Sequence, residues 1–195
     1  MSYSRWNRHE DEGRAVDDLL DAAGRVFADL GVAKATMIDV ARAAGCSRAT
    51  LYRYFPNQDA LHLGFVARAT RRIAAQITTD LELGSSLADR IVAGIAAVRN
   101  DPLLSVWFEP ENMAVPIAVS QSSELVAMLP LGLIDGFDPT PEERVEIERR
   151  GAWLLRCIVS LLAMPGRDAD DERAMIESFV VPVLTHHIEP SRSLT

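Results

Sequence analysis

Small, hydroxyl-bearing and basic side chains gather directly after Gly45, in a stretch that reads Ser47-Arg48-Ala49-Thr50. A guanidinium presents a planar fork of donors that matches O6 and N7 of guanine, so Arg48 is a candidate for binding a base edge. Ala49 and the methyl group of Thr50 are small enough to contact the methyl group of thymine. These residue types in this order favour recognition of bases in a nucleic acid.

The residues around this stretch predict two short helices that would position it. Thr36 is followed three residues later by Asp39, a variant of the capping box, and this pair predicts a helix over residues 37–44 that ends at Gly45. Ser47 is a favourable cap for a second helix over residues 48–54, which Pro56 stops. Two short helices joined by a tight glycine turn form a helix-turn-helix pattern, whose second helix enters the major groove of DNA.

The second helix divides into a face for DNA and a face for the protein core. Tyr52, Arg53 and Tyr54 are expected to reach phosphates, whereas Leu51 and Phe55 lie four residues apart and are expected to point inward. The alternatives are that Arg48 and Arg53 are solvated surface charges, and that the two tyrosines pack in the core with a wet hydroxyl group.

The segment over about residues 14–65 resembles the TetR family of transcriptional regulators. The resemblance rests on single residues and on three runs, namely Phe27, Gly31, Thr36, Ile38-Asp39-Val40-Ala41, Ala44-Gly45-Cys46-Ser47, Leu51-Tyr52-Arg53-Tyr54-Phe55-Pro56, Asp59 and Leu61. It implies a DNA-binding set made of Thr36, Ser47, Arg48, Ala49, Thr50, Tyr52, Arg53, Tyr54 and Gln58.

Gln58 departs from the family pattern, because members usually carry a lysine at this position that contacts a phosphate. A glutamine can still donate a hydrogen bond to a phosphate. Because its side chain carries no charge, its binding displaces no counterion from the DNA. The salt dependence of DNA binding is therefore expected to be shallower by about one unit of slope.

The whole chain is predicted to be all-α, because apolar residues recur at helical spacing and no β-branched run is bounded by hairpin turns. Helices are expected over residues 14–30, 57–80, 87–99, 103–108 and 140–164, and from about 168 to 190 with a kink at Pro182.

We expect an arm and helix-turn-helix domain over 1–56, a connecting helix over 57–80, and an effector-binding and dimerisation domain over 81–195. Arg5 and Arg8 fit a disordered tail, the alternative being an arm that contacts DNA.

Charge and cysteine content narrow the class of protein. The net charge is −8, but residues 1–72 carry 11 basic and 9 acidic residues, whereas the remaining acids make residues 73–195 strongly negative.

No stretch reaches the ~20 apolar residues of a membrane span and no apolar signal core opens the chain, so a cytoplasmic protein without a membrane partner is expected. Cys46 and Cys157 match no metal or redox spacing, and no constellation of acid, base and nucleophile predicts an enzyme or a cofactor.

A homodimer is expected, because one helix-turn-helix covers only half of a two-fold operator. The last two predicted helices carry apolar stripes that fit a dimer interface, formed by Trp153, Ile158, Leu161, Leu162, Met175, Phe179 and Val183. The alternative is that these stripes fill the core of the monomer.

The resemblance also implies an effector pocket in the C-terminal part. The candidate lining residues are Trp107, Phe108, Asn112, Met113, Ile117, Gln121 and Met128, with Leu129 and Phe137 beside them. This lining favours a hydrophobic or amphipathic small molecule, and the alternative role for each residue is core packing.

Together these patterns predict a ligand-released repressor that binds a palindromic operator as a homodimer. The alternative is a helical small-molecule-binding dimer without DNA-binding activity, which Gln58 and the modest positive charge of residues 1–72 allow.

Overall fold

The computed structural model describes the backbone of residues 5–81, 84–128 and 141–185, and the side chains within 13–81, 84–128 and 144–185. Across these residues the regular elements are helices, as predicted, with no strand among them. The chain forms two compact units, an N-terminal unit of Met1–Arg71 with Asn100–Val119 and a C-terminal unit of Arg72–Arg99 with Ser120–Thr195. The functional boundaries expected at residues 56 and 80 stay a prediction.

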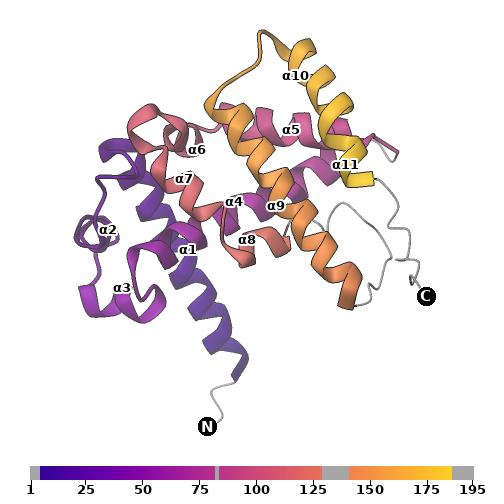
Figure 1. Ribbon diagram of the computed structural model, residues 1–195. Helices are drawn as coiled ribbons and strands as arrows, with labels where there is room; N and C mark the ends of the chain where they lie inside the picture. Colours follow the sequence, from indigo (N-terminus) through magenta and orange to yellow (C-terminus); the bar gives the residue numbers. More distant parts are fainter. Residues whose placement is uncertain (1–4, 82–83, 129–140, 186–195) are drawn as a thin grey trace. The chain divides into compact units, whose positions relative to one another are not determined.

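The N-terminal unit begins with α1 (Arg5–Leu30), α2 (Met37–Ala43), α3 (Arg48–Tyr54) and the first half of α4 (Gln58–Asp80), shown in indigo to magenta in Figure 1. The second chain segment of this unit contains α6 (Pro102–Ser105), the 3-10 turns η1 (Val106–Phe108) and η2 (Pro110–Asn112), and α7 (Ala114–Val119). Sequence reasoning assigned this second segment to the C-terminal domain, whereas its contacts place it with α1.

Helix α1 is longer than predicted, so the disordered tail expected around Arg5 and Arg8 is wrong for the backbone from residue 5 onward. Residues 5–13 lack an apolar stripe, the signal on which the prediction depended. They do contain several good helix formers and no proline that would stop the helix. The side chains of Arg5 and Arg8 lie outside the described residues.

Four aromatic rings form the centre of the N-terminal unit. Phe27 of α1 contacts His62 and Phe65 of α4 and Trp107 of η1, with ring centroids 5.3–5.5 Å apart. Phe65 and Trp107 stack with an interplanar angle of 5°. Phe27 and Trp107 are almost fully buried, so this cluster joins three segments that are distant in sequence.

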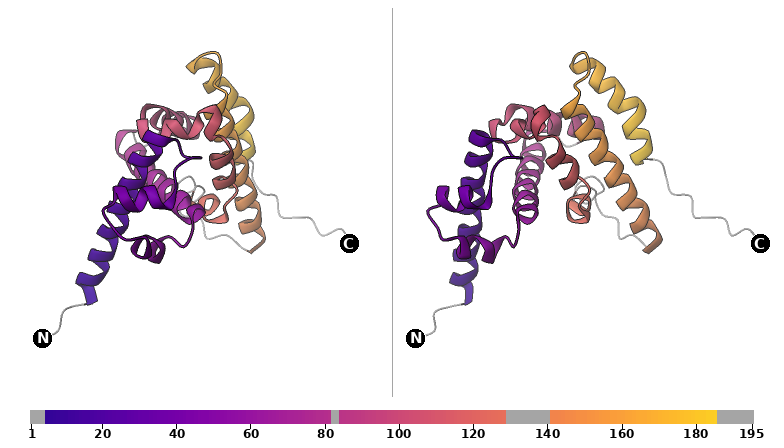
Figure 2. Two further views of the ribbon diagram at one scale, coloured as in Figure 1. Left: turned by 90° about the vertical axis from the view of Figure 1, so that its left-hand side faces the viewer. Right: turned by 60° about the vertical axis from the view of Figure 1, so that its left-hand side comes forward.

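The C-terminal unit contains α5 (Leu87–Asn100), α8 (Ser123–Met128), α9 (Pro141–Ala163), α10 (Ala169–Met175), a π-helical segment η4 (Ile176–Val180) and α11 (Val181–Thr185). The views in Figure 2 show α9 in orange beside the yellow helical segments that follow it. The π-helical segment ends at Val180, two residues before Pro182, which has no backbone N–H to donate; the kink at this proline stays a prediction.

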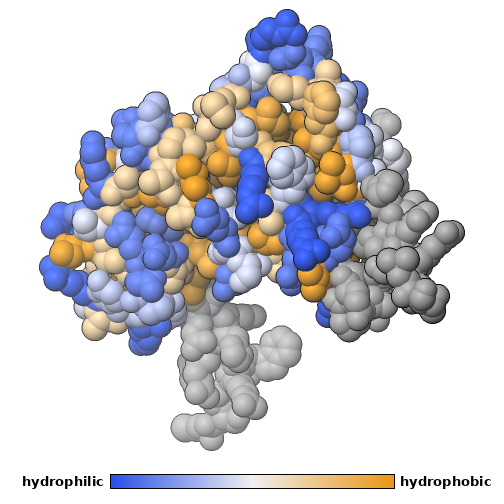
Figure 3. Space-filling view, viewed as in Figure 1, coloured by the Kyte–Doolittle hydropathy of each residue, from blue (hydrophilic) through white to orange (hydrophobic). Residues whose placement is uncertain are grey.

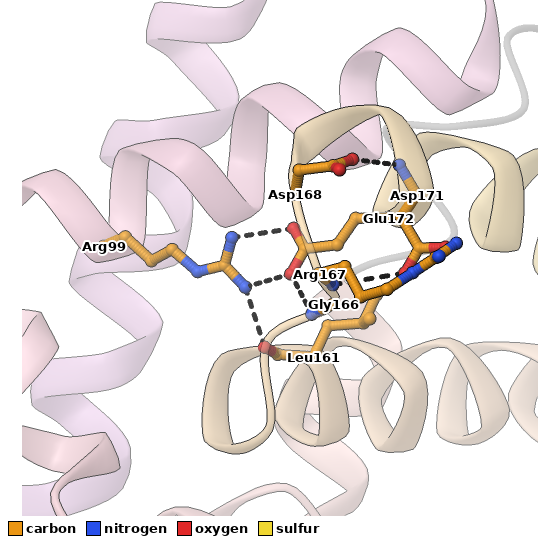
Figure 4. A network of polar contacts seen from close by, with 7 residues as sticks. All are labelled: Arg99, Leu161, Gly166, Arg167, Asp168, Asp171 and Glu172. Atoms are coloured by element: carbon orange, nitrogen blue, oxygen red, sulfur yellow. Dashed lines mark hydrogen bonds and ion pairs between the residues drawn. The ribbon is translucent and has the colours of Figure 1, made fainter.

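An ion pair between Arg99 and the buried carboxylate of Glu172 joins α5 to α10 (Figure 4). The guanidinium of Arg99 donates to both carboxylate oxygens of Glu172 at 2.7 Å and to the carbonyl oxygen of Leu161 at 2.8 Å. Glu172 also accepts from the N–H of Gly166 at 2.8 Å. These bonds lower the pKa of the Glu172 carboxyl, with the hydrogen bonds from Arg99 as the largest cause.

No single helix in the described part of the chain is long and apolar enough to cross a membrane, although Leu87–Asn100 and Pro102–Phe108 pass that test when taken together.

Candidate DNA-binding site

The turn between α2 and α3 has the hydrogen bonds of a Schellman motif. The N–H of Cys46 donates to the carbonyl of Ala41 at 3.0 Å, and the N–H of Gly45 donates to the carbonyl of Arg42 at 3.1 Å. Gly45 has a φ of +65°, a conformation that side-chain-bearing residues rarely adopt. The glycine turn that the sequence predicted therefore fixes the angle between the two helices.

The capping residues predicted for both helices are confirmed. Thr36 and Asp39 form a complete capping box, in which the N–H of Asp39 donates to Thr36 Oγ1 at 3.3 Å and the N–H of Thr36 donates to Asp39 Oδ2 at 3.2 Å. The hydrogen bond from the Thr36 side chain is the largest cause that lowers the pKa of the Asp39 carboxyl. At the start of α3, the N–H of Thr50 donates to Ser47 Oγ at 3.1 Å.

Helix α3 presents its first turn to the outside. Arg48 and Ala49 are exposed, and Thr50 is half-buried with its hydroxyl group 2.9 Å from that of Ser47. Leu51 is fully buried and Phe55 nearly so, which confirms that these two residues anchor the helix on the core. The residues proposed to read bases are thus held on a fixed backbone with their side chains accessible.

Tyr52, Arg53 and Tyr54 follow the first turn of α3 and are the residues of this helix predicted to contact phosphates. Tyr52 is 48% exposed, which excludes the alternative of a core aromatic for this residue. The guanidinium of Arg53 lies 4.8 Å from the ring centroid of Tyr54, and its Nη2 donates to the Tyr54 hydroxyl group at 3.1 Å. Arg53 and Tyr54 therefore contact each other through a cation–π interaction and a hydrogen bond, and their contact with phosphate stays a prediction.

Gln58 lies at the first position of α4, where Asn57 caps the helix by accepting from the N–H of Ala60 at 2.7 Å. The side-chain amide of Gln58 donates to the carbonyl oxygen of Ala35 at 2.7 Å. This internal hydrogen bond was not foreseen from the sequence, which suggested only a phosphate contact at this position.

The predicted effector-pocket residues are divided between the two units. Trp107 and Asn112 are buried in the N-terminal unit, Trp107 in the aromatic cluster and Asn112 in hydrogen bonds to backbone groups. Phe108 and Met113 of this unit are half-buried, and Ile117 is exposed. In the C-terminal unit Gln121 is exposed and Met128 half-buried, whereas Leu129 and Phe137 lie outside the described residues.

The predicted interface residues of the C-terminal unit differ in exposure. Phe179 is 69% exposed, and Val183 and Trp153 are 46% and 44% exposed. Leu162 is buried within the unit, and Ile158, Leu161 and Met175 are half-buried. Figure 3 shows hydrophobic side chains gathered over α9 and the helical segments that follow it.

Two short helices with a Schellman turn, both caps in place and an exposed basic first turn define a helix-turn-helix DNA-binding protein. The family model of bacterial regulatory proteins of the tetR family matches residues 19–63. The uncharacterized HTH-type transcriptional regulator Rv1255c of Mycobacterium tuberculosis is 39% identical over 175 residues, which cover 88% of this chain and 86% of that protein. The chain therefore belongs to the TetR family of transcriptional regulators.

Solved structures show the same fold at lower sequence identity. The TetR family repressor AlkX from Dietzia sp. aligns with a TM-score of 0.54 at 20% identity, covering 85% of this chain and 93% of that one. A TetR transcriptional regulator from Rhodococcus sp. RHA1 aligns with a TM-score of 0.52 at 21% identity, covering 91% of this chain and 99% of that one.

Proposed function

We propose that this DNA-binding regulator is a cytoplasmic repressor that holds a palindromic operator as a homodimer and releases it when a small molecule binds. The observation that carries the proposal is the accessible first turn of α3, where Arg48 and Ala49 project outward while Leu51 and Phe55 fix the helix. A dimer would bring two such turns to successive major grooves, about 34–36 Å apart.

The exposed apolar residues of the C-terminal unit support the homodimer. Trp153, Phe179 and Val183 are too large and too exposed to serve the core of one chain, and burying such side chains against a second copy is favourable. The proposed interface is a four-helix arrangement made of α9 and the η4–α11 segment from each chain.

For the ligand, we propose a hydrophobic or amphipathic small molecule. Phe108 and Met113 supply apolar surface that the core of the N-terminal unit does not fully bury, which supports a ligand of this kind. Trp107 and Asn112 serve the packing of the N-terminal unit instead, so we leave them out of the proposed lining.

Selection of DNA from a random pool by the purified full-length chain tests the operator part of this proposal. The expected result is an enriched palindrome whose half-site centres lie about 10 base pairs, or a multiple, apart. Enrichment of a single half-site would overturn the homodimer. Absence of salt-dependent duplex binding would favour the alternative, a helical small-molecule-binding dimer.

The ligand part is tested on the selected operator with decanoate and 1-decanol as amphipathic probes and succinate as a polar control. We expect the two amphipathic probes to raise the melting temperature of the protein and to release the operator, because a ligand shifts an equilibrium only by binding one state better. Release by succinate alone would contradict the apolar lining.

A further inference from the structure

Asn112 lies in the interior of the N-terminal unit with 1% of its surface exposed, and both polar atoms of its side chain form a hydrogen bond. Its Oδ1 accepts a hydrogen bond from the N–H of Ala33 at 3.1 Å, and its Nδ2 donates to the carbonyl of Val106 at 2.8 Å. A Cβ atom built on Gly31 would lie 3.1 Å from Oδ1, so the amide packs directly on the backbone of Gly31. Asn112 therefore joins η1 and η2 to the connection between α1 and α2.

The segment that connects α1 to α2, residues 31–36, positions the first helix of the helix-turn-helix. Gly31 ends α1 with a φ of +81°, and its carbonyl oxygen accepts from the N–H groups of Lys34 and Ala35. The next residue, Thr36, is the N-cap of α2. Because the hydrogen-bonded turn at Gly45 joins α2 to α3, a displacement of Ala33 would also shift the first turn of α3.

The segment that supplies Asn112 is held to the unit at a second place. Trp107 stacks on Phe65 of α4 and meets Phe27 of α1 edge-on, and Leu104 of the same segment is also buried. Residues 102–112 are therefore attached both to the connection between α1 and α2, through Asn112, and to helices α1 and α4, through Trp107. The half-buried Phe108 lies within this segment and Met113 follows it directly.

We infer that Asn112 is a positioning residue for DNA binding, and that it couples residues 102–113 to the helix-turn-helix through Ala33. This coupling goes beyond the proposed function, because it requires neither a dimer nor a ligand. Coupling of this kind is reciprocal, so binding of DNA at α3 must stabilise residues 102–113 to the same extent that those residues favour binding. A ligand that displaced Phe108 or Met113 would act on the reading helix by this route.

Hydrogen exchange of the full-length chain, with and without the operator selected from the random pool, tests the coupling directly. We expect exchange of the amides of residues 103–112 to slow several-fold on DNA binding, although no residue of that segment contacts DNA in the proposed complex. Unchanged exchange across 103–112, together with protection of α3, would overturn the inference while leaving the regulator assignment intact.

The variant Asn112→Ala removes both hydrogen bonds and leaves the N–H of Ala33 without a partner. It is expected to weaken operator binding about tenfold and to abolish the operator-dependent protection of 103–112. The matched control is Asn100→Ala, the same change at an exposed position, which should alter neither measurement. If Asn112→Ala weakened binding but kept the protection, the coupling would be overturned. If the variant did not fold, the exchange of the wild-type protein would decide alone.

Discussion

The side-chain amide of Gln58 donates a hydrogen bond to the backbone carbonyl of Ala35, 2.7 Å away. Ala35 directly precedes the N-cap of α2, so the first residue of α4 is tied to the point where the helix-turn-helix begins. Gln58, which the sequence suggested as a phosphate contact, therefore also holds together two parts of the N-terminal unit.

Two substitutions of Gln58 separate its internal bond from its contribution to DNA affinity. Gln58→Lys places a positive charge where a DNA phosphate is proposed to lie. The slope of the logarithm of the DNA-binding constant against the logarithm of the salt concentration is therefore expected to steepen by about one unit. Gln58→Leu leaves the Ala35 carbonyl without this donor and should lower the free energy of unfolding by about 1 kcal/mol. Anisotropy titrations at several salt concentrations and urea unfolding measure the two effects. An unchanged slope in Gln58→Lys would show that this position lies away from phosphate.

Arg48→Ala is expected to weaken binding to the selected operator by about 1–3 kcal/mol and to relax the preference at one base pair. The reason is the loss of a bidentate contact with a base edge. The control Arg25→Ala removes the same charge from an exposed position on α1 and should change operator affinity little. Equal losses in both variants would reduce the role of Arg48 to general electrostatic attraction.

We expect His62 to make the N-terminal unit sensitive to mild acid. Its Nε2 is buried without a hydrogen-bond partner among Phe27, Phe65 and Trp107, and burial lowers the pKa of the imidazole, with a weaker opposing effect of Asp59. Below the ordinary histidine pKa of about 6.5 the unfolded chain takes up a proton that the folded chain resists, so stability falls as the pH falls; above that pH the effect vanishes.

We therefore expect the melting temperature of the wild-type protein to drop between pH 7 and pH 5.5 by more than that of His62→Leu. The other histidines are common to both proteins and cancel in this comparison. Parallel pH profiles for the two proteins would refute the assignment to His62.

Glu172→Gln tests the buried ion pair of the C-terminal unit. The carboxylate is 9% exposed and its partner Arg99 is 33% exposed, so the loss is expected near 2 kcal/mol rather than the larger values of fully buried pairs. Because the pKa of Glu172 is lowered in the folded state, its stabilisation is present above the ordinary carboxyl pKa and is lost as the pH falls through the lowered value. Urea unfolding at pH 7 and in the acid range checks both statements.

The control for Glu172 is Glu177→Gln, which removes a carboxylate from an exposed pair with Arg173. Its effect should stay below about 1 kcal/mol. A similar loss in both variants would mean that burial of Glu172 adds nothing to the ion pair.

Phe179→Asp tests the proposed dimer. A charge in place of this exposed aromatic side chain is expected to shift the protein towards monomer in sedimentation experiments and to weaken operator binding as a consequence. Met164→Glu introduces a charge at a side chain of similar exposure, 70%, just beyond the end of α9, and should leave the dimer intact. A dimeric Phe179→Asp protein would place the interface elsewhere.

The local features of the reading unit follow from neighbouring residues and were predictable. Thr36 and Asp39 lie three positions apart, Ser47 precedes its helix directly, and Leu51 and Phe55 share one face, so short-range geometry alone determined their roles. The start of α1 was missed because charged residues without an apolar stripe give no periodic signal.

The long-range contacts could not be predicted in the same way. Trp107 and Asn112 fit a ligand pocket and a protein core equally well by residue type, and only the fold shows that their partners are Phe65 and Ala33. For Gln58 the sequence offered a donor but no means of identifying the acceptor, which is 23 residues earlier in the chain.

The aromatic cluster of Phe27, Phe65 and Trp107 has a consequence for protein engineering. A hybrid regulator made by fusing residues 1–80 to a foreign sensor would leave Phe27 and Phe65 facing water, because the tryptophan that covers them is encoded downstream of the junction. A hybrid that keeps the DNA-binding specificity of this protein therefore needs both residues 1–80 and residues 100–119 of this chain.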